Sequence, residues 1–350
     1  MLRMRSVRFF LRYVFLMGAL AVLPAMLAAH AALANDSQKE INTHAEALLA
    51  KSRDLSNIEG PGNPAFVLNA KIHFQMGTQS AEGEAQILWT APDHYRVAYT
   101  APNYGYVEIA RDGYRYRVRT NNEMPIFIFE LQRAFAAAIH DSAYPEQKIK
   151  RAEVTQAGNE PLTCITFGSR AVIRDCLDSS GDLVTREIEP LRAVPAPNAH
   201  YEFSDFVAFG AKRFPQKVIF RGGEGHVIEI DVQRLAFVKE VAADAFRIPT
   251  GAMQEPWCAE PQTSRVWLTP VFAQNDPRDV VEASIALANA KATLYCVIAP
   301  TGRLRSATVM QASKPVKDED LRTWMKGAAF RTQLCGKLGV EYEVEVTFIR

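Results

Sequence analysis

Apolar and polar residues alternate along several stretches in the first third of the chain. Between residues 66 and 74 every second position is apolar, and the same period of two recurs at 85–89, 95–99 and 114–118. This alternation is typical of strands that have one buried and one solvated face. Because only short connections separate the four stretches, they predict an antiparallel meander.

Two further stretches follow a helical period. Residues 37–55 carry apolar side chains at Ile41, Ala45 and Leu48, and residues 125–140 carry them at Leu131 and Ala138, among others, behind an N-terminal proline. Spacings of three and four residues predict amphipathic helices at both places. Between and after them, strands are expected at 149–156, 162–167, 171–177, 183–189, 200–208, 215–221 and 226–237. A sheet of so many strands must be large and strongly curved.

The region after residue 250 changes character. Residues 251–278 contain four prolines and no periodicity, which predicts a linker. The following residues, 279–350, predict a small unit with helices at 279–290 and 317–328 and strands at 292–299, 303–311 and 340–349. We therefore expect an α+β protein with a large domain at 35–250 and a small C-terminal domain at 279–350.

The first 34 residues have the composition of an export signal. Four arginines precede an apolar run from Tyr13 to Ala29, and Ala32-Leu33-Ala34 provides a cleavage site of small residues. The alternative is an uncleaved membrane anchor, because the apolar run approaches the length that spans a bilayer. Either reading places the rest of the chain outside the cytoplasm, and we expect a periplasmic protein.

Charge excludes one class of partner. The chain has 40 Lys and Arg against 39 Asp and Glu, and removing the four arginines of residues 1–34 leaves 36 against 39. A nearly neutral chain lacks the clustered positive charge that binding to nucleic-acid phosphates requires. No nucleic-acid partner is expected.

Five cysteines remain in a chain that is expected to meet an oxidising compartment. Cys164 and Cys176 flank a turn at equal distances, so a hairpin would place them opposite each other and predicts a disulfide, with two buried thiols as the alternative. Cys296 and Cys335 are a guessed second pair, which would leave Cys258 odd. No Cys-x-x-Cys is present, so zinc is not expected, and no cofactor is indicated.

The first domain resembles the LolA-like superfamily of periplasmic lipoprotein carriers. The resemblance rests on Glu82-Gly83, Leu88-Trp89, Pro92, Tyr95, Asp112-Gly113 and Phe214-Pro215, over residues 36–249. It implies an incomplete antiparallel barrel, capped by helices, that holds acyl chains against its concave face. One position departs from the carriers, which often have an arginine before the corner proline where this chain has Ala91.

The C-terminal unit resembles the C-terminal domain of TonB energy transducers. The matching features are a strand at 292–298, the turn Thr301-Gly302, Leu321 and Phe330, and the run from Gly339 to Phe348. The resemblance implies that the strand at 340–349 pairs with an extended segment of an outer-membrane or envelope protein. The alternative is a scaffold domain whose last strand only completes its own sheet.

Motifs of the common enzyme classes are absent from the sequence. The histidines are scattered, and we find no nucleophile elbow, phosphate-binding loop or dinucleotide fingerprint. Arg115, Arg117 and Arg119 alternate along one strand and predict a solvated polar face, or a contact with anionic headgroups. The chain therefore predicts a binding protein and no catalytic residues.

Our main hypothesis is an exported, non-enzymatic protein that holds a lipid or acylated protein on the apolar face of the sheet. The alternative is an accessory protein of a TonB-like transport system in which the first domain acts as a spacer. The residues expected to line the apolar site are Phe66, Leu68, Ile72, Phe74, Ile87, Trp89, Tyr95, Val97, Tyr99 and Tyr116. Each of them can equally be ordinary core, because strand aromatics are often buried for packing alone.

Overall fold

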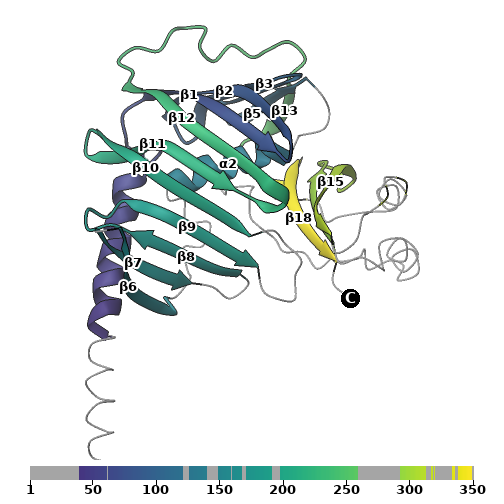
Figure 1. The fold of residues 1–350 in the computed structure, drawn as a ribbon. Coiled ribbons are helices and arrows are strands. Elements are labelled where there is room, and N and C mark those ends of the chain that lie inside the picture. Colours follow the sequence, from purple (N-terminus) through teal and green to yellow (C-terminus); the bar gives the residue numbers. More distant parts are fainter. Residues whose placement is uncertain are drawn as a thin grey trace, which may run out of the picture.

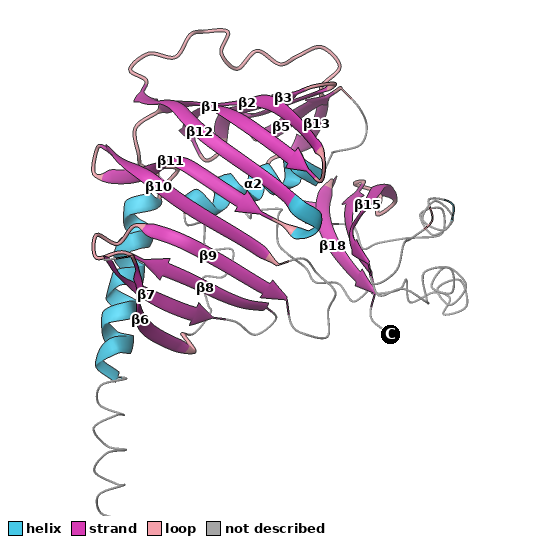
Figure 2. Cartoon of the chain, viewed as in Figure 1, coloured by secondary structure: helices cyan, strands magenta, loops and turns pink. Residues whose placement is uncertain are grey.

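The computed structural model describes residues 39–60, 62–120, 126–139, 149–158, 160–167, 171–190, 198–258, 292–312, 317, 319, 333–335 and 338–348. The expected leader at 1–34, the expected helix at 279–290 and most of the expected helix at 317–328 lie outside these residues. The described part is mostly strand, with two longer helices (Figure 2). No described helix has the length and hydropathy needed to cross a bilayer.

One antiparallel sheet of thirteen strands forms the body of the protein, and Figure 1 shows it curving around helix α2 (Ile126–Ala138). Its strands are β1 (Phe66–Met76), β2 (Gln79–Ala91), β3 (His94–Ala101), β4 (Tyr104–Arg111), β5 (Tyr114–Arg119), β6 (Arg151–Ala157), β7 (Glu160–Phe167), β8 (Ala171–Leu177), β9 (Leu183–Pro190), β10 (Ala199–Phe209), β11 (Lys212–Arg221), β12 (His226–Phe237) and β13 (Met253–Pro256). Their order is β13-β5-β4-β3-β2-β1-β12-β11-β10-β9-β8-β7-β6. The prediction of a large, curved antiparallel sheet is confirmed.

The alternation correctly predicted β1, β2, β3 and β5, but β4, between the stretches at 95–99 and 114–118, was not predicted. In β1 the first, third, fifth, seventh and ninth residues are buried and the side chains between them are at least partly exposed. The connection between β4 and β5 is a two-residue turn at Asp112-Gly113, and both residues have positive φ, at 54° and 77°. Asp-Gly favours this turn because its backbone twist matches that of the two strands it joins.

The corner from Trp89 to Arg96 is shorter than the sequence suggests. Ala91 already pairs with His94 and Trp89 with Tyr95, so only Pro92 and Asp93 form the turn. The ladder is irregular between Trp89 and Ala91. Proline can occupy this turn because its missing N–H leaves no ladder hydrogen bond unmade.

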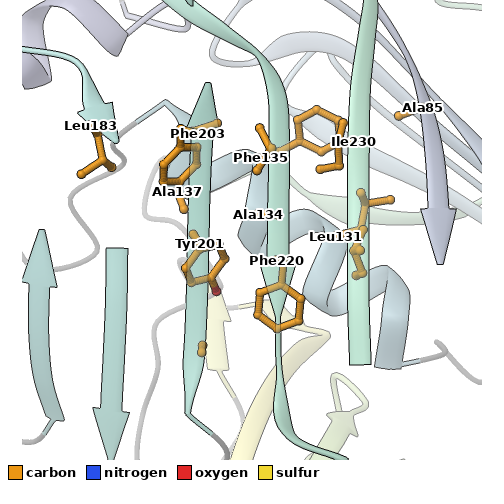
Figure 3. Packing of buried hydrophobic residues seen from close by; sticks show 14 of the residues in the cluster. Ala85, Leu131, Ala134, Phe135, Ala137, Leu183, Tyr201, Phe203, Phe220 and Ile230 are labelled. Carbon is orange, nitrogen blue, oxygen red and sulfur yellow. The ribbon is translucent and has the colours of Figure 1, made fainter. Parts of the chain in front are cut away.

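The main core lies between the concave face of the sheet and α2. Figure 3 shows Leu131 and Phe135 of α2 among Tyr201, Phe220 and Ile230 of the central strands. The predicted helix at 125–140 is therefore confirmed as α2. Burying a leucine such as Leu131, which is fully inaccessible, contributes about 2–3 kcal/mol. The N-terminal helix, residues 39–56, adds Ala45, Leu48 and Leu49 to the same core near the β8–β9 turn.

The C-terminal part contains a second, smaller sheet. Its described strands are β14 (Ala292–Ile298), β15 (Leu304–Ala312) and β18 (Tyr342–Phe348), in the order β15-β14-β18, together with the hairpin of β16 (Gln333–Cys335) and β17 (Leu338–Val340). Tyr295 of β14 packs on Phe129 of α2 with ring centroids 4.4 Å apart, and both Tyr295 and Val297 belong to the main core. The small sheet is thus packed against α2, and it lies on the right in Figure 1.

Strand β13 lies inside the stretch that the sequence predicts as a linker. It pairs with β5 and forms one edge of the large sheet, with Glu255 opposite Arg115 and Met253 opposite Arg117. The sequence did not predict this strand, because four residues give too few repeats to establish a period.

Candidate ligand-binding cavity

A cavity of about 360 Å³ opens on the concave face of the sheet, at the end formed by β2, β3 and β4. Its volume lies at the lower end of the range of small-molecule sites, about 300–1,000 Å³. The residues that line it are Glu59, Ile87, Trp89, Pro92, Tyr95, Val97, Tyr99, Tyr106, Glu108, Gln132, Trp257 and Cys258. They come from three neighbouring strands, from α2, and from the segments that follow the N-terminal helix and β13.

Strand register places the apolar wall. Ile87 lies opposite Val97, and Trp89 lies opposite Tyr95, in adjacent strands. Directly opposed residues on one face of an antiparallel pair have their Cβ atoms about 4.5–5.5 Å apart. Two alternating strands in this register therefore present one continuous aromatic and aliphatic surface to the cavity.

The cavity also has a polar side, centred on Glu108 of β4. Its carboxylate accepts hydrogen bonds from the hydroxyl groups of Tyr95, at 2.7 Å, and Tyr106, at 2.6 Å, and lies 3.8 Å from a guanidinium nitrogen of Arg115. Burial alone would raise the pKa of Glu108, but Arg115, Arg117 and the two hydroxyl groups outweigh it and hold that pKa below its usual value. Glu108 therefore stays ionised at neutral pH, at the edge of an apolar surface.

The predicted lining residues fall into three groups. Ile87, Trp89, Tyr95, Val97 and Tyr99 line the cavity. The four residues from β1 pack in the core and are at most 3 % exposed; they are Phe66, Leu68, Ile72 and Phe74. Phe66 stacks on Trp89 with ring centroids 5.6 Å apart, and the ring centroids of Phe74 and Phe127 of α2 are 4.7 Å apart.

Tyr116 lies on the other face of the sheet. It pairs with Ile109 in β4, whereas Glu108 and Arg117 share the concave face. The neighbour that it contacts is Tyr114, with ring centroids 6.3 Å apart. The aromatic residues of β5 therefore lie on the opposite face of the sheet from Tyr95 and Tyr99 of β3. Only the register between the strands shows this.

The prediction of a solvated arginine face on β5 is wrong. The side chains of Arg117 and Arg119 are 2 % and 6 % exposed, and that of Arg115 is 13 % exposed. Because β5 runs beneath the C-terminal part, its arginines meet carboxylates from distant segments. An alternating charge pattern has the same appearance in sequence whether water or a second sheet covers it.

The carboxylates that meet these arginines are Glu255 of β13 and Glu341, between β17 and β18. Glu255 pairs with Arg115 at 3.0 Å and also with Arg117, and its other oxygen accepts the backbone N–H of Glu341 at 3.1 Å. Glu341, whose side chain is fully buried, pairs with Arg117 at 3.2 Å and with Arg119.

Arg305 of β15 also lies 3.1 Å from the Glu341 carboxylate. Buried charges require partners of this kind, because an unpaired charge in a protein interior is strongly unfavourable. The set of five residues formed by Arg115, Arg117, Arg119, Glu255 and Glu341 is called the buried ion cluster below. It fastens the small sheet to the large one beside the cavity.

One disulfide is as predicted and the other is not. Cys164 and Cys176 face each other across β7 and β8 and are bonded, with Cα atoms 4.0 Å apart. The guessed pair of Cys296 and Cys335 is wrong, because Cys335 is bonded to Cys258 and Cys296 is a buried free thiol. Cys296 lies in the middle of β14, while Cys335 lies in the separate β16–β17 hairpin.

Several residues of the site carry no clear sequence pattern. Glu108 is the exception, because it alternates in phase with Tyr104 and Tyr106, and a carboxylate on an aromatic strand face indicates a buried charge. Gln132, Glu59 and Trp257 stand at the cavity only through tertiary packing. Among the described residues there is no group of three His, Cys, Asp or Glu side chains that could hold a metal ion.

Comparison with known proteins gives a distant likeness of fold. No family model and no curated protein matches the chain. A LolA superfamily protein from Nitrosomonas europaea aligns with a TM-score of 0.39 and 13% identity, over 58% of this chain and 96% of its own. A putative outer membrane lipoprotein-sorting protein domain from Vibrio parahaemolyticus aligns with a TM-score of 0.39 and 9% identity, over 57% of this chain and 94% of its own.

MucB aligns more extensively and less closely, with a TM-score of 0.25 and 10% identity over 88% of this chain and 94% of its own. None of these structures bears on the TonB-like resemblance, which stays a prediction.

Proposed function

We propose that this protein is an exported, non-enzymatic binding protein that holds a lipid or lipid-modified ligand in the concave-face cavity. The observation that carries the proposal is the composition of the cavity wall, where Ile87, Trp89, Val97 and Tyr99 form an apolar surface beside the ionised Glu108. An apolar wall with a small number of placed polar groups is the usual form of a small-molecule site.

The arrangement indicates how an amphiphile would lie. Its apolar chain would cover the surface between Ile87 and Val97, and its polar end would approach Glu108, Gln132 and the hydroxyl groups of Tyr95 and Tyr106. A ligand group that donates a hydrogen bond suits this end, because a carboxylate accepts and cannot donate. Burial of the apolar chain contributes about 25 cal/mol for each Å² removed from water.

The test is native mass spectrometry of the gently purified protein, together with titration by the neutral fluorescent probe N-phenyl-1-naphthylamine. Val97→Glu places a charge on the cavity wall, and Val97→Trp fills the cavity without adding charge. Both variants should lose the co-purifying lipid and at least 90% of the fluorescence gain. Val154→Glu is the matched control, because Val154 is 59% exposed at the far end of the sheet and should retain both.

Wild type that carries no lipid and gives no fluorescence gain, or a Val97→Trp variant that binds the probe as wild type does, would refute the proposal. Circular dichroism of each variant establishes that the sheet is intact. Leu68→Glu is unsuitable here because Leu68 is 1% exposed in the core, and its loss would unfold the protein.

A second function, docking of an envelope protein at the C-terminal sheet, is favoured by the position of β18. Among the described strands β18 pairs with β14 alone and so lies at an edge of its sheet. An edge strand can accept an extended peptide through its free backbone groups. Photo-crosslinkers placed at each position from 342 to 348 in turn should then label one envelope protein with a period of two residues, and labelling without this period would argue against strand pairing.

A further inference from the structure

The two disulfides differ in their exposure. Cys164 and Cys176 are 0 % and 3 % exposed within β7 and β8, whereas Cys258 and Cys335 are both half-buried, outside the large sheet. Thiol–disulfide exchange requires a thiolate to reach a disulfide sulfur, so access decides which bond reacts first. The Cys258–Cys335 bond, called the clasp disulfide below, is the accessible one.

The clasp disulfide is also part of the cavity. Trp257 and Cys258 line the cavity together with the strand residues, and the segment 253–258 that carries them is called the wall segment below. Cys335 belongs to β16, whose partner β17 leads directly into Glu341 of the buried ion cluster. The bond therefore ties one wall of the cavity to the β16–β17 hairpin, which leads into β18 of the small sheet.

Few other contacts hold the wall segment in place. Strand β13 has four residues, lies at the edge of the sheet and pairs only with β5 among the described strands. Beyond it, the backbone N–H of Trp257 donates to the carbonyl of Gly113 at 2.9 Å. Glu255 attaches the segment through Arg115, Arg117 and the backbone of Glu341, and Arg305 of β15 donates to the Sδ atom of Met253 at 3.9 Å. Short edge elements with few backbone hydrogen bonds are the parts of a protein that open most readily.

We propose that the clasp disulfide is a thiol–disulfide exchange site through which a dithiol reductant opens the cavity. One thiolate of the reductant attacks a clasp sulfur, the Cys258–Cys335 bond breaks, and a mixed disulfide forms with release of one protein thiolate. The second thiol of the reductant then attacks the mixed disulfide. Two electrons and two protons pass to Cys258 and Cys335, which become thiols, and the reductant leaves as a disulfide.

With the clasp open, the wall segment keeps the strand pairing of β13, the contacts of Glu255 and Met253 and the backbone hydrogen bond of Trp257, and bound ligand exchanges faster. This inference rests on the proposed function, because it assigns a control to the same cavity. The free cysteine does not compete in the exchange, since Cys296 is completely buried in β14 and burial raises the pKa of its thiol above the ordinary value.

The first experiment measures dissociation of N-phenyl-1-naphthylamine from the full-length protein, with and without dithiothreitol at a concentration that leaves Cys164–Cys176 intact. Reduction should raise the dissociation rate at least tenfold. A variant with Cys258→Ala and Cys335→Ala should release the probe at the fast rate whether or not dithiothreitol is present. The matched control with Cys164→Ala and Cys176→Ala should keep the response, as should Cys296→Ala. A rate that changes less than twofold on reduction of the wild type would overturn the proposal.

The second experiment does not depend on any ligand. Hydrogen exchange, followed by mass spectrometry, should show the amides of Met253, Gln254 and Glu255 exchanging at least tenfold faster after reduction, while those of β7 and β8 stay protected. Mapping by thiol alkylation should find Cys258 and Cys335 modified at a lower dithiothreitol concentration than Cys164 and Cys176. If the probe fails to bind and these amides still respond, the proposed function fails and the clasp stands. Unchanged exchange in β13 would overturn the clasp itself.

Discussion

At the β6–β9 end of the sheet, covalent and charged contacts join residues that are close in sequence, whereas at the β5–β13 end they join residues that are far apart. Cys164 and Cys176 are separated by 12 positions, and Arg186 binds Asp175 through two hydrogen bonds across 11. At the other end Arg117 and Glu255 are 138 positions apart in the sequence, and Arg119 and Glu341 are 222 positions apart. The two cysteines of the clasp disulfide are separated by 77 positions.

This difference has consequences for both stability and function. Contacts between near neighbours form once a hairpin closes, and each loop that they close is short. Contacts between distant segments form only after the large sheet and the small sheet have met, and they are lost together if the two separate. The cavity lies at the second end, where the wall can be released without disturbing the hairpins of the first.

The largest expected effect concerns the two disulfides. Loop-closure entropy predicts that replacing Cys258 and Cys335 by alanine costs about 4–5 kcal/mol, and that replacing Cys164 and Cys176 costs about 3 kcal/mol, because the first bond closes the longer loop. Urea denaturation of the two double variants measures both values. Equal losses would show that loop length does not distinguish the two ends.

The next effect concerns the buried ion cluster. Glu341→Ala removes the carboxylate that pairs with Arg117 and Arg119, leaves those charges buried, and should cost about 3–5 kcal/mol in the free energy of unfolding. Glu189→Ala is the control, because Glu189 is exposed on β9 and should change stability by less than about 0.5 kcal/mol. Similar values for the two variants in thermal denaturation would mean that Glu341 contributes no more than a surface residue.

A smaller effect separates core from cavity lining. Leu68→Ala should cost about 2–5 kcal/mol, because Leu68 is 1% exposed and its loss leaves an enclosed void. Val97→Ala should cost about 1 kcal/mol or less, because the valine already borders open space. The two residues share the concave face, and what covers them accounts for more of the expected difference than the one extra methylene of leucine, about 0.8 kcal/mol. A greater loss for Val97→Ala in urea denaturation would place Val97 in the core.

The smallest effect is the pH dependence of Glu108. Its folded pKa is lower than its unfolded pKa, so the ionised carboxylate adds stability above the unfolded value, and that contribution is lost as the pH falls through the folded value. The difference in stability between wild type and Glu108→Gln should be about 1–2 kcal/mol at pH 7 and should shrink below about pH 4. Thermal melting from pH 3 to pH 7 measures it, and a difference that grows in acid would reverse the assigned sign.

Much of the large sheet could be predicted from sequence because its pairing is local. The alternation in β1, β2, β3 and β5, the Asp112-Gly113 turn and the pairing of Cys164 with Cys176 depend on residues within one hairpin, whereas β4 was not predicted. The helical spacing of Leu131, Ala134 and Ala138 likewise identified α2 within a few residues. In each case the periodicity of one short segment decides which side is buried.

The candidate site was only partly predictable, and the reason can be seen at β5. Alternation separates Tyr116 from the arginines at 115, 117 and 119, but it does not say which of the two sets faces the concave side. A buried arginine requires a carboxylate, and Glu255 and Glu341 come from segments that no local rule connects to β5. The pairing of Cys258 with Cys335 was missed for the same reason.

The sequence by itself determined most strands of the large sheet and its two longer helices, the Asp112-Gly113 turn, and which cysteines lie opposite each other within a hairpin. Only the tertiary structure decided that five of the predicted apolar residues border a cavity while the four from β1 fill the core. It also decided that a row of arginines on β5 is buried beneath the C-terminal sheet. The periodicity of a segment shows which side chains share one face of a strand or helix. What covers that face depends on where distant segments pack.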